Sequence, residues 1–536
     1  MFMYSIGSGN NPELVERVLR SRHWWAPTES DVEYNLRWQQ LLPPAARYGA
    51  LCSTNKRTVF NHLPGQRVLH SKLSLYQTLL KRLGTGVFDF LPITYNLSVS
   101  AEFDRFVRHY QYISKATGEA GEAGEPASLR SEYLSTPPSR NRQNLWIVKP
   151  VGLNRGRGIK IVRSPEEVEA YMKEYEEVVK ARGRTGLTKS ASTLLIQKYL
   201  EHPYLLDRRK FDIRCYALIT SEGSGYIYEY GYLRLSSFEY DMEKTDLNVH
   251  LTNNAVQKCY GLLEDGNMLH YRDLDRKMAE DDENLPQDYF TSVLWPQMKR
   301  IMTVVLLVFS KSVLGAVNCE GCFDLYGFDF MIEMVEGPEG STSYRPVLIE
   351  INSNPCISLE SSVSWDILPR MLDDLFDLTI DRIFMPPRTS CEKLVQLMQE
   401  AKRGKRPSTS EFYTGTVTLD TIPGLRWDAL DLVSPVSLRP NYFMRVMQRW
   451  SRHTGALPDE SRSRSHSSSS SESSDESSSL QRLLASQTQD CDMRFRPASG
   501  FVQEMFARLA ASPAFSGRRP PRAKSTARKE ENSKLK

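Results

Sequence analysis

The chain of 536 residues contains few cysteines, and their spacing does not form a disulfide framework or a zinc site. The eight cysteines are scattered, and only Cys319 and Cys322 form a CxxC pair. A zinc site needs a second pair or a nearby histidine, and the sequence offers neither. This excludes a zinc-stapled domain and a small disulfide-rich scaffold, and it fits a reducing compartment.

Long hydrophobic runs are also missing. The first residues, MFMYSIGSGNNPELVERVL, lack the basic start and apolar stretch of a secretory signal. The most apolar window, residues 301–309, is too short to cross a bilayer and is followed by Ser310 and Lys311. We therefore expect a buried helix at this position and no membrane partner.

Most of the chain has no strong excess of charge of either sign. The formal net charge is +4, but residues 518–536 alone hold eight Lys or Arg against two Glu. The basic character belongs to the tail, which predicts an acidic partner surface rather than a nucleic-acid-binding core.

Composition divides the chain into ordered and unordered parts. An α/β domain is predicted over 1–113, followed by a flexible insertion over 114–143 that is rich in Gly, Glu, Ala, Ser and Pro. Apolar patterning then runs to 386. Residues 387–536 are predicted to contain a basic amphipathic helix, a Ser-rich linker and a basic disordered tail.

Two strand-like motifs that are far apart in the sequence have charged residues flanked by apolar ones. In KFDIR, the side chains of Lys210, Asp212 and Arg214 share one face of a strand, and in LIEINSNP so do Glu350 and Asn352. Burying such charges is costly unless they are paired or meet a charged ligand. A triphosphate with magnesium would satisfy both sets, whereas a salt-bridge ladder on a solvated sheet face is the alternative.

Residues 144–162 are predicted to form a strand, a Gly-rich turn and a second strand. Lys149 at the strand end can reach phosphate oxygens, and Gly156 and Gly158 allow a backbone loop to approach them. Arg155 and Arg157 add positive charge. The motif GxxxxGK[ST] is absent, which excludes a P-loop, while an ordinary β-hairpin remains the alternative.

Three further segments complete the pattern. LLIQKYLEHP over 194–203 is predicted to be a strand, either a plain core strand or a link between two lobes whose backbone binds adenine. HLTNNAVQK over 250–258 forms a polar loop. Residues 323–333 and 347–355 are predicted to pair as two strands, which brings Asp329 to Glu350 and Asn352 as oxygen ligands suited to magnesium.

These motifs occur in the order of an ATP-grasp fold. KPVGLNRGRGI, QKYLEHPYLLDRRKFDIR, GYLRLS, HLTNNAVQK, FDLYGFDFMIE and LIEINSNP together resemble the tubulin tyrosine ligase-like family. The resemblance covers roughly residues 1–385 and is strongest over 144–360. It implies an α/β fold with a central ATP-grasp lobe over 144–225 and a C-terminal lobe over 226–386. Two departures are visible: the usual Arg-Lys-Asp near the N-terminus reads His70-Ser71-Lys72-Leu73, and Arg157 stands where Lys is frequent.

The resemblance also implies roles for individual residues. Lys210, Asp212 and Arg214 would face the γ-phosphate and the acceptor, and Arg234 would hold the carboxylate of the incoming amino acid. The residues expected to bind ATP are Lys149, Arg155, Gly156, Arg157, Gly158, Ile159, Gln197, Lys198, Tyr199, Leu200, Lys210, Asp212, Thr252 and Asn253. The residues expected to bind Mg²⁺ are Asp329, Glu350 and Asn352.

The activity implied is an ATP-dependent ligation of an amino acid to glutamate side chains, or growing side chains, of tubulin C-terminal tails through an acyl phosphate. The wording of the motifs, residue by residue, is most similar to the branch of the family that adds glycine, so glycine is favoured as the added amino acid. Glutamate is the alternative. A second alternative is an inactive scaffold that binds microtubules. The resemblance further implies a monomer in the cytoplasm, on the cytoskeleton and in cilia or flagella.

Overall fold

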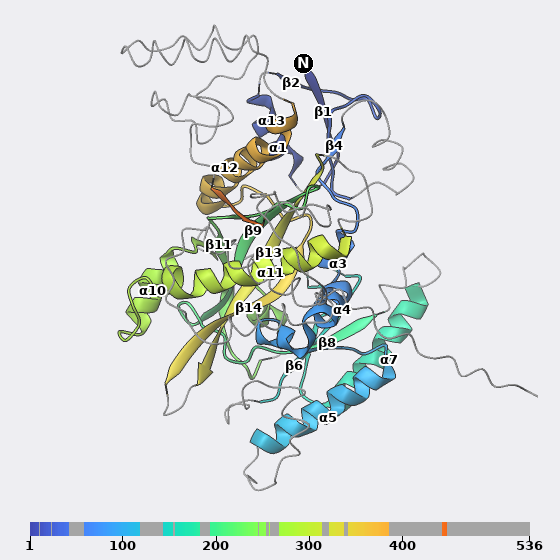
Figure 1. Cartoon of the computed structure of the whole chain (residues 1–536). Helices are drawn as coiled ribbons and strands as arrows, with labels where there is room; N and C mark the ends of the chain where they lie inside the picture. The colour runs from blue at the N-terminus through green and yellow to red at the C-terminus, as the bar shows by residue number, and fades with distance from the viewer. Residues whose placement is uncertain are drawn as a thin grey trace, which may run out of the picture. The chain divides into compact units, whose positions relative to one another are not determined.

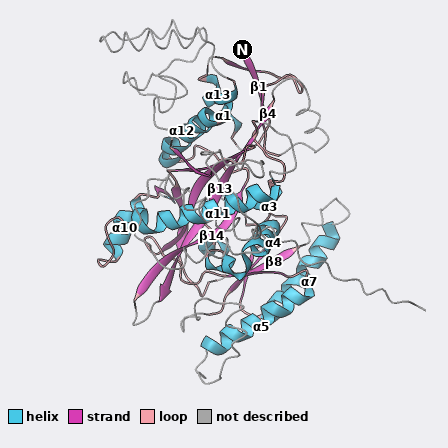
Figure 2. Ribbon diagram, in the orientation of Figure 1, coloured by secondary structure: helices cyan, strands magenta, loops and turns pink. Residues whose placement is uncertain are grey.

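The computed structural model describes a mixed α/β protein. The described residues are 1–9, 11–22, 24–41, 58–117, 143–153, 156–182, 193–244, 246–252, 257, 267–313, 321–336, 341–384 and 442–447. They form three β-sheets with helices packed against them (Figures 1 and 2). All of them lie in one compact unit that spans Met1–Pro458.

The N-terminal sheet is parallel, with the strand order β2-β1-β3-β4. Its strands are β1 (Phe2–Ile6), β2 (Trp25–Pro27), β3 (Leu36–Trp38) and β4 (Val59–Phe60). Between β1 and β2 runs α1 (Pro12–Arg20), whose Leu14, Val15, Val18 and Leu19 recur at helical spacing and are buried.

The second sheet is antiparallel, with the strand order β5-β8-β6-β7. Its strands are β5 (Thr94–Asn96), β6 (Trp146–Pro150), β7 (Lys160–Val162) and β8 (Leu194–Lys198). The helices α5 (Ser100–Thr117) and α7 (Pro165–Arg182) cover one face, where Phe106 and Val168 join Trp146 and Val148 in one core cluster. Ser164 caps α7 by accepting from the Glu167 backbone N–H at 3.2 Å.

The third sheet has the long strand β9 (Arg209–Thr220) at its centre. On one edge, β9 pairs with β11 (Tyr232–Glu239) and β10 (Gly225–Tyr228), and on the other with β13 (Phe323–Glu336). The strand β14 (Thr342–Asn352) pairs with β13, so the hairpin predicted from the two apolar runs is confirmed. The short strand β12 (Met268–His270) extends the sheet beyond β11.

Helices cover the third sheet and link it to the first. The apolar helix α11 (Trp295–Val313) follows a π-helical turn, η5 (Phe290–Leu294), and crosses the strands β13 and β14 (Figure 1). The segment Phe290–Ser310 is the one described helix long and apolar enough to cross a membrane, but 61% of its apolar window is buried. A core helix behaves in this way, which confirms the buried helix predicted from residues 301–309.

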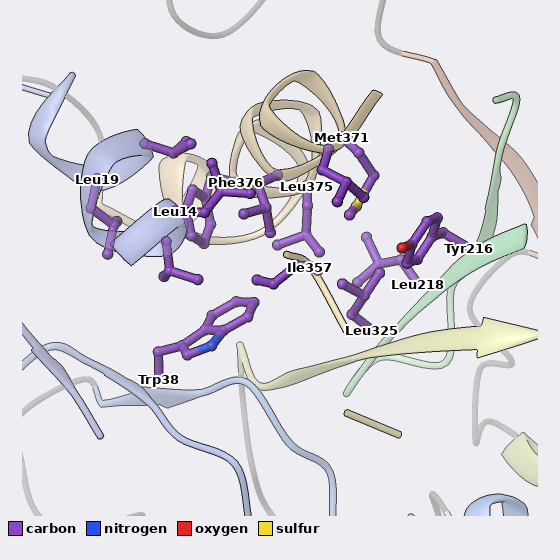
Figure 3. Close-up of a cluster of buried hydrophobic side chains, with 14 of the residues drawn as sticks. Leu14, Leu19, Trp38, Tyr216, Leu218, Leu325, Ile357, Met371, Leu375 and Phe376 are labelled. Carbon is purple, nitrogen blue, oxygen red and sulfur yellow. The ribbon is translucent and has the colours of Figure 1, made fainter. Parts of the chain in front are cut away.

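A single hydrophobic core joins chain segments that are far apart in sequence. In Figure 3, Leu14 of α1, Trp38 of β3 and Phe376 of α12 (Ser362–Leu378) meet Leu218 of β9 and Leu325 of β13. The N-terminal sheet therefore packs on the third sheet through α1 and α12. The remaining short elements are α3 (Arg67–His70), α4 (Lys72–Leu83), η1 (Gly84–Asp89), α8 (Leu247–His250), α10 (Asp273–Asp281) and α13 (Ile380–Ile383).

Two strand pairings cross the predicted domain limits. The strand β5 precedes residue 113, yet it pairs with β8 of the predicted central lobe. The strand β9 precedes residue 226 and β10 spans it, yet both belong to the same sheet as β13 and β14. The domain limits themselves stay predictions.

One strand falls within residues 387–536, for which the sequence predicted a basic helix, a Ser-rich linker and a basic tail. The strand β15 (Phe443–Met447) pairs antiparallel with β10 at the edge of the third sheet. Phe443 is buried there, with its ring centroid 4.8 Å from that of Tyr228, and the Tyr442 backbone N–H donates to Asp374 at 3.1 Å. An apolar residue that precedes the Ser-rich stretch thus packs in the core. The Ser-rich linker and the basic tail lie outside the described residues.

Candidate active site

Strand register brings the predicted charged residues onto one face of the third sheet. Directly opposed residues of paired strands share a face, as do residues i and i+2 of one strand. The opposed pairs are Arg234 with Asp212, Arg214 with Asp329, and Asp329 with Glu350. Asn352 lies two residues beyond Glu350, so one row of polar side chains crosses β11, β9, β13 and β14.

This row is a buried ion network. Arg214 makes two hydrogen bonds to the Asp329 carboxylate, one of them 3.0 Å from Nη2 to Oδ2. Arg234 bridges two carboxylates, with Nε 2.6 Å from Asp212 Oδ1 and Nη2 2.9 Å from Asp329 Oδ2. The Thr252 hydroxyl donates to the other oxygen of Asp212. Such pairing offsets the cost of removing these charges from water.

Gly327 gives Arg214 the space it occupies. A Cβ atom at this position of β13 would lie 3.2 Å from Arg214 Cδ and 2.9 Å from the Pro355 side chain. A residue with a side chain would therefore displace either the guanidinium or the loop that follows β14. The GFDF motif holds a glycine here because the arginine passes so close.

One donor of Arg214 has no partner among the described residues. Its Nη1 is buried and makes no hydrogen bond, although Arg214 is only 3% exposed. Leaving a buried donor unsatisfied costs on the order of 1–3 kcal/mol. An oxygen of an anionic ligand would remove this cost.

The predicted magnesium ligands lie together at the edge of the network. The Asn352 Nδ2 atom is 3.2 Å from Asp329 Oδ2 and 3.3 Å from Glu350 Oε1. A bulge in β14 opposite Asp329 and Phe330 places Ile349 and Glu350 at the opening of the cavity described next. Among the described residues, no three His, Cys, Asp or Glu side chains gather as a metal site. Two carboxylates and an amide, completed by oxygens of a ligand, are the kind of donor set that Mg²⁺ takes, so these three residues stay a predicted magnesium site.

A cavity opens between the second and third sheets, and its empty space, with the open solvent at its mouth included, is about 560 Å³. Lys149 and Gln197 contribute from the second sheet, and Glu350 and Asn352 from the third. Lys149 Nζ donates to Gln197 Oε1 at 2.6 Å, and Gln197 Nε2 donates to Thr94 at 3.0 Å.

Lys210 is buried, Lys149 is half-buried, and the two lysines are close enough for their charges to interact. Burial lowers the pKa of Lys149 to about 8, with Lys72 acting in the same direction and Glu350 opposing. Burial, and then the charge of Lys149, lowers the pKa of Lys210 to about 7, against the attraction of Asp212. Two lysines with depressed pKa values fit a site whose ligand supplies the missing negative charge.

The pKa values of the two aspartates of the network are shifted in opposite directions. Burial raises the pKa of Asp212, opposed by Arg234 and reinforced by the charge of Asp329. Burial acts on Asp329 too, but Arg214 and Arg234 hold its pKa below the ordinary value. Asp329 thus stays a carboxylate, as a metal ligand must.

The Gly-rich turn has the conformation expected of its glycines. Gly156 and Gly158 adopt φ of 73° and 68°, in the left-handed region that other residues avoid. Tyr171 of α7 donates to the Gly158 carbonyl at 2.7 Å and holds the turn. Ile159 is half-buried after the turn, while Arg157 is exposed.

Other predicted residues lie away from the cavity. Side chains alternate along β8, so Lys198 projects to the helix-covered face, where it donates to the Leu145 carbonyl at 2.8 Å and pairs with Glu201. Leu200 packs in a separate cluster with Met331 and Val347. Arg155 and Asn253 lie outside the described residues.

Sequence reasoning missed part of the cavity wall. Leu69, Lys72 and Tyr76 line it from α3 and α4, together with His70. Within α4, Lys72 and Tyr76 recur at i and i+4, the spacing of one helix face, which was a usable signal, whereas the extended Ser71 separates Leu69 of α3 from them. It also missed His250 and Glu201. Glu201 is buried and accepts from the Leu145 backbone N–H at 2.9 Å, which fixes the start of β6.

The chain is similar to known proteins over most of this region. Residues 51–391 match the tubulin-tyrosine ligase family. Protein polyglycylase TTLL10 of Rattus norvegicus is 25% identical over 405 residues, 71% of this chain and 53% of the relative. Inactive polyglycylase TTLL10 of Homo sapiens is 30% identical over 405 residues, 71% and 57% of the two chains. Tubulin polyglutamylase TTLL5 of Mus musculus is 25% identical over 389 residues, 68% and 24%.

The chain spans about half the length of the first of these relatives. The family match covers more than half of the chain and includes every strand that contributes to the cavity and the ion network. The chain belongs to the tubulin-tyrosine ligase family.

Proposed function

We propose that this protein is an ATP-dependent ligase that joins an amino acid, glycine in preference to glutamate, to glutamate side chains of tubulin C-terminal tails. The observation that carries the proposal is the meeting of two half-sites. Lys149 and Gln197 of one sheet face Glu350 and Asn352 of another across one cavity, beside the buried cations of the ion network. An ATP-grasp arrangement, with ATP and Mg²⁺ between two lobes, accounts for this geometry.

The residues have distinct tasks in this proposal. Lys149, Lys210 and the Gly-rich turn neutralise and cover the phosphates, and Asp329, Glu350 and Asn352 hold Mg²⁺, which supplies further neutralisation of phosphoryl charge. The acceptor carboxylate takes the terminal phosphoryl group from ATP and releases ADP. The amine of the incoming amino acid then forms the amide bond, and phosphate leaves.

Arg214 and Arg234 are placed to orient carboxylates. Both guanidinium groups are pinned by buried aspartates, so they present a fixed geometry without reorganising. The unpaired Nη1 of Arg214 would donate to an anionic ligand oxygen. Arg234 would bind the carboxylate of the incoming amino acid.

The amino acid is the finer part of the proposal. Relatives named polyglycylase and tubulin glycylase support glycine, while the relative named polyglutamylase supports glutamate as the alternative. The human relative is named inactive, so a microtubule-binding scaffold is the alternative outside the enzymes. A monomer acting on the cytoskeleton and in cilia, without nucleic acid or membrane partners, completes the proposal.

The test offers labelled glycine and labelled glutamate in parallel to purified protein with ATP, magnesium and microtubules. The proposal expects glycine incorporation into the tubulin tails, located by mass spectrometry. Incorporation of glutamate alone would replace the proposed amino acid and keep the ligase. Failure to incorporate either, with ATP still bound, would contradict the ligase and support the scaffold.

A further inference from the structure

A chain of hydrogen bonds reaches from Lys210 to a histidine that no part of the proposed chemistry uses. Lys210 Nζ donates to the Tyr199 hydroxyl at 2.8 Å. That hydroxyl lies 2.7 Å from His250 Nδ1, and His250 Nε2 lies 2.7 Å from the Lys244 carbonyl oxygen. Lys210, Tyr199 and His250 are all buried.

The partners fix the direction of each bond. A carbonyl oxygen only accepts, so His250 Nε2 carries the proton and, in the neutral ring, Nδ1 accepts. The Tyr199 hydroxyl therefore donates toward His250 Nδ1 and turns its lone pair toward the Lys210 ammonium. The Tyr240 hydroxyl, which donates its own proton to the Glu201 carbonyl at 3.0 Å, is a second acceptor for the Tyr199 proton. Burial lowers the pKa of His250, and the nearby charge of Lys210 acts in the same direction, while the hydrogen bond to the Lys244 carbonyl opposes both. The ring therefore stays neutral.

Aromatic rings hold the same ammonium group. Lys210 Nζ lies 4.3 Å from the centroid of the Tyr199 ring and 5.6 Å from that of Tyr240. The His250 ring meets both tyrosine rings edge-on, at 5.5 Å and 5.9 Å. Cation–π contact and a hydroxyl acceptor both favour the charged lysine.

Other groups act on this charge from every neighbouring element. The charged or titratable groups around Lys210 and His250 are Lys149 on β6, Arg163 after β7, Asp212 on β9, Tyr240 and Asp241 after β11, and Tyr199 after β8. Lys149 opposes the Lys210 charge and Asp212 supports it. The Tyr199 hydroxyl is the one group in this set that both accepts from Lys210 and is oriented by a second side chain.

We infer that Tyr199 and His250 are positioning residues that hold Lys210 extended and protonated for the anionic substrate. The inference rests on the proposed function, which gives Lys210 a phosphate to bind. In this inference the Tyr199 side chain positions Lys210 and does not bind adenine. His250 acts only through Tyr199, by taking the hydroxyl proton.

The test measures the titration of Lys210 without nucleotide, by NMR of the full chain labelled with ¹³Cε-lysine, with the signal assigned by Lys210→Arg. Tyr199→Phe keeps the ring and removes the hydroxyl, and we expect it to lower the pKa of Lys210 by about one unit. His250→Leu should lower it by less. His250→Gln, which can both accept and donate, should restore most of the difference.

The matched control is Tyr204→Phe, an equally buried tyrosine whose hydroxyl donates to Asp281 away from the cavity. It should leave the Lys210 titration unchanged. In the double variant, His250→Leu should add nothing to Tyr199→Phe, because the histidine acts through the hydroxyl. An identical titration in wild type and Tyr199→Phe, or fully additive shifts, would overturn the inference.

Ligation assays separate this inference from the proposed function. If Lys210 must be charged, the alkaline limb of the ligation rate in Tyr199→Phe should move to lower pH by the shift that NMR measures. A wild-type protein that does not ligate would contradict the proposed function alone, since the titration is measured without substrates.

Discussion

Two buried arginine–aspartate clusters in this protein use the same chemistry for different ends. In the candidate site, Arg214 and Arg234 share Asp212 and Asp329 across three strands. Far from the cavity, Arg22 after α1 meets three aspartates of α12 and α13. Its nitrogens lie 2.9 Å from Asp373, 3.3 Å from Asp377 and 2.9 Å from Asp381.

The two clusters differ in how completely their arginine donors are paired and in their balance of charges. The Arg22 guanidinium also donates to the Val18 and Asp373 carbonyls and stacks 5.3 Å over Phe376, so protein surrounds it on all sides. In the site, by contrast, one donor of Arg214, Nη1, has no partner among the described residues. Burial raises the pKa of Asp381 to about 6 despite Arg22, while the two site arginines hold that of Asp329 low. The Arg22 cluster, the closed cluster, has three carboxylates for one cation. The site cluster, the open cluster, has two arginines for two aspartates and keeps one arginine donor unpaired, which an anionic ligand would satisfy.

The largest effect is expected from removing the arginine of the closed cluster. Arg22→Leu leaves three buried carboxylates without their cation, which should destabilise the protein by about 3–5 kcal/mol. Chemical denaturation followed by fluorescence measures the change. Arg20→Leu serves as the control, because Arg20 makes an exposed pair with Glu16 on the same helix, worth less than about 1 kcal/mol. Equal midpoints for the two variants would show that the closed cluster does not hold α1 to α12.

A smaller effect is expected from the titration of Asp381. Its pKa is raised from 3.8 in the unfolded chain to about 6, so the folded state binds the proton more tightly. The stability contributed by this proton is present below pH 4 and is lost as the pH rises through 6. The stability of wild type relative to Asp381→Asn should therefore fall by about 1–3 kcal/mol between pH 4 and 7.

Urea unfolding at a series of pH values checks this difference. The exposed Asp31 supplies the control, since Asp31→Asn should run parallel to wild type over the same range. Parallel curves for Asp381→Asn as well would mean that the carboxylate is not buried in the closed cluster.

The two clusters were not equally predictable from sequence. The site residues share strand faces, and the alternation in KFDIR and LIEINSNP already placed Lys210, Asp212 and Arg214, and then Glu350 and Asn352, side by side. The pairing of β13 with β14 and the resemblance to the family supplied the rest. Their roles in binding ATP and magnesium stay predictions.

The residues of the Arg22 cluster form no local pattern in the sequence. Arg22 and Asp381 are separated by 359 residues, and no spacing rule relates a residue after one helix to a face of another. The strand β15 and the contact of Tyr199 with His250 were hidden for the same reason. Such contacts depend on how distant elements pack, which local periodicity does not encode.

The central claim is that the open cluster and its cavity serve a ligand rather than the fold. Glu350→Gln tests it most directly, with the ligation rate and the unfolding midpoint measured on one preparation. Glu350 is half-exposed at the cavity, so stability should stay within about 0.5 kcal/mol of wild type while ligation falls to background. Glu239→Gln, the same change at an exposed strand end, should retain both. Undiminished ligation by Glu350→Gln would contradict the claim.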